Sequence, residues 1–152
     1  MKGLRFGLAA GIALSVLAGV AAPSLALEPG EAITLRTAMM KSMGAHMGSI
    51  KAAIGAGDGK VVAAQANVIA AMAPTLPSVF PKGSGSEAGK TRAKANVWSE
   101  WDKFKGGTMT LRTEAVALAK VAATNDKAKM AAQFGQMAKV GCGGCHSSFR
   151  AK

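Results

Sequence analysis

Acidic and histidine side chains are scarce in this sequence, which has 8 Asp and Glu, 2 His and no Tyr among 152 residues. Groups so few and so widely spaced offer no pair for acid–base or nucleophilic catalysis, so we do not expect an enzyme. Cysteine is equally scarce, and the only two, Cys142 and Cys145, lie close to the C-terminus. A disulfide between them would close too short a loop to stabilise a fold, so their role must be local chemistry.

Aromatic residues make up only 5% of the chain, and its formal net charge is +11. The Lys and Arg residues are spread over the sequence without a basic run, whereas proteins that bind nucleic acids gather such residues on one face. We therefore expect no nucleic-acid partner. A positively charged surface could instead steer association with an acidic redox protein.

Long apolar runs are absent except at the N-terminus, where a short basic region precedes the apolar residues 8–22 and a small-x-small site ends at Ala26. This order is typical of a secretory signal peptide. A transmembrane anchor is the alternative, but the run is shorter than the roughly 20 residues that span a bilayer. We predict a signal peptide at residues 1–26, a single domain at residues 27–152, export to the periplasm, and no stable membrane insertion after cleavage. Loss of two basic residues would lower the net charge from +11 to +9.

Alternating β-branched residues are also scarce, and the abundance of Ala, Met, Leu and Lys favours helices throughout. Apolar residues recur at helical spacing in four segments, at about residues 31–54, 59–72, 93–123 and 126–150. The long connection at residues 73–92 is rich in Pro, Gly and Ser. Short, long and short connections between four helices predict an all-α fold, an antiparallel four-helix bundle.

Local signals indicate how these helices end. Gly57 is expected to end the first helix and Asp58 to cap the second. Gly106-Gly107 is expected to bend the third helix. The apolar residues 76–80 of the long connection should pack back on the bundle.

The pentapeptide Cys142-Gly143-Gly144-Cys145-His146 carries the strongest chemical signal, because C-x-x-C-H is the attachment motif for c-type haem. Two thiols form thioethers with two vinyl groups of the porphyrin, and the following imidazole ligates iron. On a helix the three side chains project from one side. A thioredoxin-like dithiol would need a helix N-terminus, whereas this motif ends the last helix. A zinc site would need all of the Cys and His residues, including His46, to converge. We therefore predict one covalent haem c with its iron.

Arg36 occupies a position on the apolar stripe of the first helix, where an unpaired charge is costly. A haem propionate would pair well with its guanidinium. The alternative is that Arg36 lies at a frayed helix end and extends to water. Arg150, just after the haem motif, is a weaker candidate for the same role.

Three methionines on the same stripe, Met40, Met43 and Met47, could present a thioether to the second face of the iron. A methionine stripe at helical spacing is more often simple core. In the presence of the haem motif, we expect one of the three to approach the iron. His46 lies beside the stripe and is expected to face solvent or to form a hydrogen bond rather than to ligate.

Together these residues resemble those of the class II c-type cytochromes, which comprise cytochrome c′ and its low-spin relatives of the cytochrome c-556 type. The resemblance covers nearly all of residues 27–152 and rests on a haem motif close to the C-terminus. Further matching residues are Arg36, Met40, Lys41, Gly44, Gly48, Leu76-Pro77, Phe80-Pro81 and Val97-Trp98.

The resemblance implies that Cys142 and Cys145 hold haem c, that His146 is the proximal iron ligand, that Arg36 lies near the haem propionates, and that Met40 occupies the distal position. In high-spin cytochrome c′ an apolar residue at that position leaves the iron five-coordinate, whereas a methionine closes the sixth position in the low-spin relatives. Because the sequence motif Leu-Pro-x-x-Phe-Pro in the long connection is more similar to the low-spin type, we predict Met40 as the distal ligand.

These observations predict a periplasmic mono-haem electron carrier with low-spin iron ligated by His146 and Met40. Its partners would be periplasmic or membrane redox proteins. The alternative is a five-coordinate cytochrome c′ that binds nitric oxide or carbon monoxide. A homodimer is also allowed, since class II proteins often pair.

Overall fold

A computed structural model describes residues 27–152, and the predicted signal peptide at residues 1–26 lies outside the described residues. The helices, in chain order, are α1 (Pro29–Ala56), α2 (Gly59–Met72), α3 (Asn96–Ser99), α4 (Trp101–Ala122), α5 (Lys127–Gln136) and α6 (Gly144–Phe149). Two 3-10 segments, Ala73–Val79 and Ser86–Ala88, lie in the long connection, and a π-helical segment, Met137–Gly143, joins α5 to α6.

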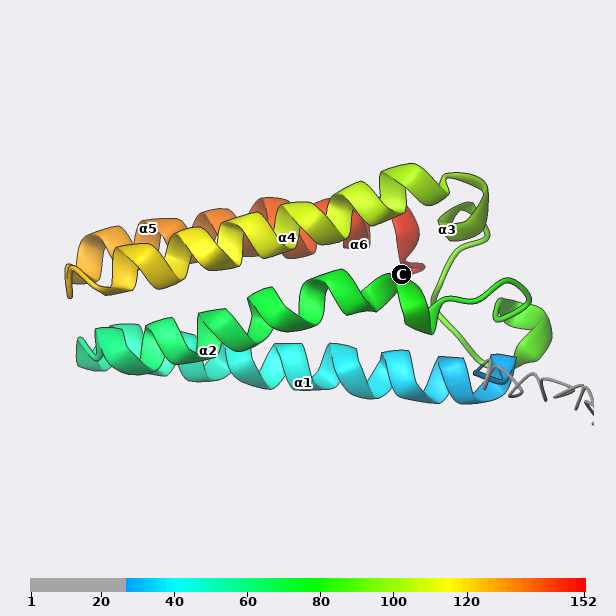
Figure 1. Ribbon diagram of the computed structural model, residues 1–152, viewed down its shortest axis with the longest axis horizontal. Coiled ribbons are helices and arrows are strands. Elements are labelled where there is room, and N and C mark those ends of the chain that lie inside the picture. Colours follow the sequence, from blue (N-terminus) through cyan, green and yellow to red (C-terminus); the bar gives the residue numbers. More distant parts are fainter. Residues whose placement is uncertain (1–26) are drawn as a thin grey trace, which may run out of the picture.

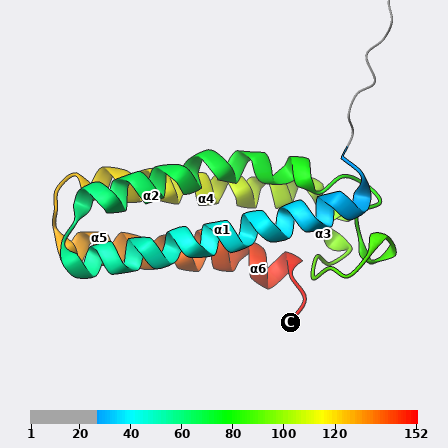
Figure 2. The same ribbon diagram turned by 90° about the horizontal axis from the view of Figure 1, so that it is seen from below.

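Four helical rods run side by side in alternating directions: α1, α2, α4 and the continuous α5–α6 (Figure 1). Both short turns lie at one end of the bundle, and the long connection and the C-terminus lie at the other, as Figure 2 shows. We call the latter the motif end of the bundle, because it holds the C-terminal pentapeptide. The predicted all-α antiparallel four-helix bundle is confirmed.

The first two helices begin and end close to the predicted positions. Pro29 occupies the first turn of α1, where its missing N–H is not needed. Gly57 ends α1 in the left-handed conformation with φ 76°, which glycine adopts without strain. Asp58 caps α2 by accepting a hydrogen bond from the Val61 N–H at 3.0 Å, as predicted.

Two hydrophobic clusters fill the bundle. The larger cluster lies between α1, α2, α4 and α5 and includes Ile50, Ile69, Leu118 and Met130. The smaller cluster lies at the motif end and consists of Val79, Phe80, Val97, Phe104 and Phe149. Residues 76–80 of the long connection therefore pack back on the bundle as predicted, since Leu76, Val79 and Phe80 are all buried.

The third helix differs from its prediction. Its break falls at Glu100, between α3 and α4, whereas α4 continues as one helix through Gly106-Gly107, so the interruption that the sequence suggested at these glycines is wrong. The break follows from tertiary contacts, because Trp98 Nε1 donates to the carbonyls of Phe80 and Pro81 at 3.0 Å and ties α3 to the long connection.

One segment of the described chain, Gly59–Val79, is long and apolar enough to cross a membrane by length and composition. The expectation that no segment after the N-terminal run reaches this level is therefore wrong by that criterion. Val62, Ala66 and Ile69 of this segment are buried in the bundle, so one face of α2 belongs to the hydrophobic core.

Candidate haem site

The pentapeptide Cys142–His146 lies where the last helical rod changes its geometry. Cys142 belongs to the π-helical segment, whereas Cys145 and His146 belong to α6. The sequence predicted one regular α-helix here, which is wrong because residues 137–143 are π-helical. A π turn is wider than an α turn, so the angular spacing of the side chains changes. All three functional side chains are partly exposed at the motif end. π-helical turns inside α-helices are frequently found at functional sites.

Two glycines let this segment lie close against α4. A Cβ atom at Gly141 would come within 2.9 Å of Leu111 Cδ1 and 3.2 Å of Leu111 Cα, so the backbone approaches α4 where a side chain would clash. On α4 itself, a Cβ atom at Gly107 would overlap the Sγ atom of Cys145. The cysteines consequently face the bundle interior at the boundary between the clusters, Cys142 against the larger and Cys145 against the smaller.

The chemistry of the two thiols argues against a dithiol redox centre. Both cysteines are free. Burial raises the pKa of the Cys142 thiol, and burial followed by the neighbouring Cys142 raises the pKa of Cys145. The thiols are therefore held protonated, whereas redox-active dithiols lower a thiol pKa to form the thiolate.

His146 is held in the form that ligates metals. Burial lowers its pKa, and the positive charges of Arg150 and Arg92 lower it further. The neutral imidazole keeps a free lone pair on one ring nitrogen, which is what an iron ligand requires.

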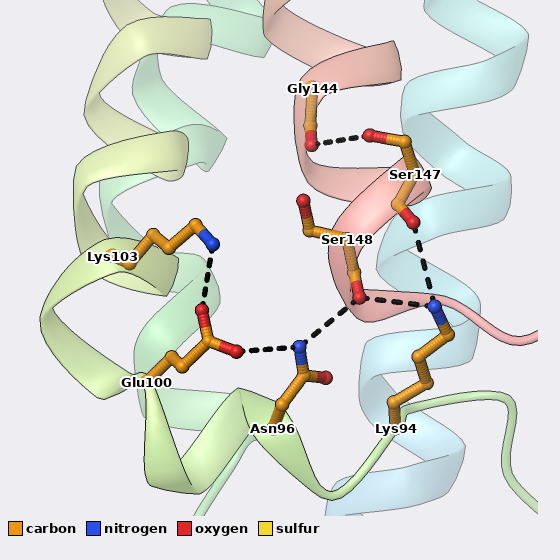
Figure 3. Close-up of polar contacts among 7 residues, drawn as sticks. All are labelled: Lys94, Asn96, Glu100, Lys103, Gly144, Ser147 and Ser148. Atoms are coloured by element: carbon orange, nitrogen blue, oxygen red, sulfur yellow. Dashed lines mark hydrogen bonds and ion pairs between the residues drawn. The ribbon is translucent and has the colours of Figure 1, made fainter.

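Polar side chains from the segment before α4 close the carbonyl end of α6 (Figure 3). Lys94 Nζ donates to the Ser147 and Ser148 carbonyls at 3.5 and 3.2 Å, and Asn96 Nδ2 donates to the Ser148 carbonyl at 3.3 Å. An ammonium group at a helix C-terminus also interacts favourably with the helix dipole. No signal in the sequence indicates this contact, because more than 50 residues separate its two sides.

Backbone pairing holds the same end. The Lys94 N–H donates to the Phe149 carbonyl at 2.9 Å, and the Ala151 N–H donates to the Arg92 carbonyl at 2.8 Å. These bonds flank an antiparallel bridge between Ala93 and Arg150. Backbone bonds, together with the side chains of Lys94 and Asn96, thus fix the C-terminal end of the helix that carries His146.

Arg36 is buried inside the motif end, with only 4% of its surface exposed, so the alternative of a frayed end that extends to water is wrong. Its guanidinium donates to Ser84 Oγ at 2.8 Å and to the Ser84 carbonyl and Thr91 Oγ1 at 2.7 Å. It also lies 4.7 Å from the centre of the Phe80 ring. Burial lowers the pKa of Arg36, and the negative charge of Glu87 partly opposes this effect. No carboxylate within residues 27–152 lies within ion-pair distance of the guanidinium.

The methionines of α1 pack as core. Met43 belongs to the larger cluster, and Met40 and Met47 are partly buried against it. Met39 was not singled out from the sequence, yet it contacts both clusters. His46 is hydrogen-bonded through Nδ1 to Gln65 Oε1 at 2.5 Å, as the sequence led us to expect.

A family model described as cytochrome c′ matches residues 31–150. The solved cytochrome c′ of Thermochromatium tepidum is 32% identical, has a TM-score of 0.73, and aligns over 84% of this chain and 99% of its own. The chain belongs to the cytochrome c′ family.

Two further similarities support the assignment. A second solved cytochrome c′, whose dimer dissociates under the control of a ligand, is also 32% identical with a TM-score of 0.73, and aligns over 83% of this chain and 98% of its own. The cytochrome c′ of Pararhodospirillum photometricum is 41% identical over 76 residues, which are 50% of this chain and 59% of that protein. The chain thus spans little more than half the length of this curated relative.

Membership of the cytochrome c′ family corrects the predicted function. The prediction of a low-spin electron carrier ligated by His146 and Met40 is wrong, because the family model and these relatives are cytochrome c′, the five-coordinate type. The physical reason for the error is that the methionines of α1 pack in the hydrophobic core, as methionines at helical spacing usually do.

The predicted cofactor is confirmed, since this family binds covalent haem c with its iron. The residues present suit that group, because two protonated thiols and a neutral imidazole gather at one end of one helix, and thiol and imidazole are the groups that c-type haem requires. Residues 27–152 contain no group of three His, Cys, Asp or Glu side chains that could hold a metal ion by themselves, so the zinc interpretation has no support.

Proposed function

We propose that this chain is a periplasmic cytochrome c′ that carries one covalent haem c and binds a diatomic gas, nitric oxide or carbon monoxide. The observation that carries the proposal is the cytochrome c′ match over residues 31–150, which spans Arg36 and the whole pentapeptide Cys142–His146. When bound, haem with a single protein ligand supplies an iron coordination position that is open to small gases. Export through a signal peptide at residues 1–26 is part of the proposal.

Each residue of the chain has a distinct role in this proposal. Cys142 and Cys145 would hold the haem through thioethers, and His146 would donate its lone pair to the iron. The lowered pKa of His146 supports this role, because burial and the charges of Arg150 and Arg92 favour the neutral ring, which is the form that ligates iron.

Arg36 would pair with a haem propionate. Its bonds to Ser84 and Thr91 use three of the five guanidinium N–H groups, which leaves two for a carboxylate. A buried guanidinium without an ion pair is also costly, and a carboxylate from the cofactor would offset that cost. Met40 would form part of the apolar wall on the distal side and would not ligate.

Spectroscopy of the purified holoprotein tests this proposal. Electron paramagnetic resonance of the oxidised protein should show high-spin iron, and carbon monoxide should convert the reduced spectrum fully to a carbonyl adduct. A haem stain on a denaturing gel checks covalent attachment, because thioether-bound haem survives denaturation. Solved proteins of this fold include a carbon monoxide-bound variant of the cytochrome c′ of Alcaligenes xylosoxidans, whose 23% identity shows the fold alone and whose ligand suggests the probe.

A Met40→Leu variant provides the matched control. Leucine keeps the size and apolar character of methionine, so the core packing should change little. If Met40 does not ligate, the variant and the wild type should have the same high-spin spectrum and the same response to carbon monoxide. A low-spin wild type that becomes high-spin in Met40→Leu would overturn the proposal.

A homodimer is the oligomeric state that we propose. Leu35 on α1 is 43% exposed, and Val61 and Val68 on α2 are each 39% exposed, so apolar side chains are available on the outer faces of these helices. The related protein whose dimer dissociates under ligand control supports the same state. Sedimentation of the holoprotein with and without carbon monoxide tests it, and a monomer under both conditions at micromolar concentration would contradict it.

A further inference from the structure

Gly107 lies in the N-terminal third of α4, at the point where the Cys145 sulfur rests against that helix. A Cβ atom at position 107 would overlap Cys145 Sγ and lie 4.0 Å from Cys145 Cβ. Its neighbour Gly106 has no atom within 4 Å of the corresponding position. Glycine inside a helix is less favourable than alanine, so the room that Gly107 leaves for a sulfur gives a reason for glycine at this position.

We propose that Gly107 is a positioning residue for haem attachment at Cys145, an inference that rests on the proposed function. Without a side chain at position 107, the Cys145 sulfur can occupy the space against α4 where the smaller cluster meets the motif. A methyl group there would force the sulfur into another rotamer and direct it elsewhere. Cys142 packs against the larger cluster, so its sulfur would not be affected in this way.

The attachment step depends on where the sulfur points. In attachment, the Cys145 thiol would add across a vinyl group of the porphyrin: an S–C bond would form, the π bond of the vinyl C=C would be lost, and the thiol hydrogen would pass to the neighbouring vinyl carbon. No oxidant or reductant is consumed. Since the vinyl group is fixed by the ring and the sulfur by its rotamer, an error in the rotamer lowers the chance of bond formation.

The same substitution should leave the fold intact. In the apoprotein the overlapping atom is the end of a side chain with one rotatable bond, which can move aside at small cost. Alanine is also the better helix former at an α4 position. Gly107→Ala should therefore separate attachment from folding.

The experiment compares Gly107→Ala with Gly106→Ala, each expressed as the full chain with a cytochrome c maturation apparatus. Alkylation of the denatured proteins followed by peptide mass analysis measures the fraction of chains with a free Cys145 thiol. We expect that fraction to rise at least tenfold in Gly107→Ala, with haem attached through Cys142 alone, and to match the wild type in Gly106→Ala. The α band of the pyridine haemochromogen should shift to longer wavelength in Gly107→Ala, because one vinyl group stays unsaturated.

The possible failures are distinguishable. A wild type without haem at Cys145 would refute the proposed attachment itself. Two thioethers in both the wild type and Gly107→Ala would refute the role of Gly107 and leave the proposed function standing.

If Gly107→Ala does not accumulate, the same substitution in a Cys145→Ala background decides the matter. When Gly107 acts through Cys145, the double variant should accumulate to the level of Cys145→Ala alone, with the same helicity. A double variant that is also lost would show that Gly107 supports the fold in general, and the inference would be wrong.

Discussion

Replacing Arg36 by methionine tests whether the buried guanidinium holds the long connection against α1. Methionine retains an apolar stem of similar length, so the change removes the charge and the hydrogen bonds while keeping most of the packing. The Ser84 carbonyl belongs to a fully buried residue and accepts from Arg36 at 2.7 Å. Without that donor, a buried acceptor would be left unpaired.

The magnitude follows from the contacts that are lost. Leaving a buried acceptor unpaired costs about 1–3 kcal/mol. The contact of Arg36 with the Phe80 ring contributes about 0.5–2 kcal/mol. The Ser84 and Thr91 hydroxyls lose less, because Ser84 Oγ still donates to the Pro81 carbonyl and Thr91 Oγ1 still accepts from the Ala93 N–H. Because removal of a buried charge also relieves its desolvation, we expect the free energy of unfolding to fall by about 2–4 kcal/mol.

Denaturant unfolding of the holoprotein, followed by far-ultraviolet circular dichroism, measures this change together with the loss of the proposed pairing between Arg36 and a haem propionate, so the measured fall should be at least as large. Hydrogen exchange should show the greatest loss of protection at the backbone amides of residues 80–91, since these are the residues that the guanidinium holds. Arg112→Met is the matched control, because Arg112 is exposed on α4 and the substitution makes the same change of charge. If the two variants differ in free energy by less than about 0.5 kcal/mol, the stabilising role of Arg36 is refuted.

Two further predictions concern helix ends. Asp126 caps α5 by accepting from the Lys129 N–H at 3.0 Å, and that bond is the main reason why its pKa is lowered. A lowered folded-state pKa means that the carboxylate stabilises the fold above its unfolded-state pKa and loses that effect as the pH falls through the folded-state pKa. Asp126→Ala should therefore lower the melting temperature at pH 7 and change it little in strong acid, and an equal loss at both pH values in thermal circular dichroism would contradict this account. Lys94→Met should reduce the free energy of unfolding by about 0.5–1 kcal/mol by uncapping α6, with faster exchange of the Phe149 and Ala151 amides. Unchanged exchange at those two amides would count against the capping role.

The helices that the sequence predicted best are those whose ends depend on neighbouring residues. The second helix was predicted at residues 59–72 and spans Gly59–Met72, because Asp58 caps it and the apolar spacing is regular. The first helix was predicted within two residues at each end, at 31–54 against Pro29–Ala56. In both cases the signals lie inside the helix or next to it, where sequence reasoning can use them.

The errors arose where distant residues decide the local structure. The break at Glu100 is set by contacts of α3 with the long connection and with the end of α6, and neither is visible in apolar spacing. Gly106-Gly107 looked like a bend because glycine weakens a helix, yet packing keeps α4 regular and gives Gly107 a neighbour 38 positions away in sequence, Cys145. The π-helical segment has no periodicity of its own long enough to be recognised.

The predicted site shows the same division. The pentapeptide identified the cofactor, because haem attachment and iron ligation require this spacing of two cysteines and a histidine. The sixth iron ligand was predicted wrongly, since a methionine on an apolar stripe has the same spacing whether it ligates or packs. The environment of Arg36 could not be predicted either, because Ser84 and Thr91 lie about 50 residues further along the chain.

The distribution of long-range polar contacts explains how the chain holds its site. Away from the motif end, the Gly59 N–H donates to Asn125 Oδ1, His46 is hydrogen-bonded to Gln65, and Gln133 donates to Glu114, alongside the hydrophobic packing of the larger cluster. At the motif end, the long connection is bound on one side by Arg36 of α1 and on the other by the C-terminus of α6, through side chains and backbone together. Hydrophobic packing alone could not fix this end, because the pentapeptide has two glycines and lies at the boundary of two clusters. The helix that carries His146 can therefore be loosened by breaking these polar contacts while the rest of the bundle stays folded. Arg36→Met and Lys94→Met should accordingly act first on the motif end and only then on the whole fold, whereas Asp126→Ala acts at the opposite end of the bundle.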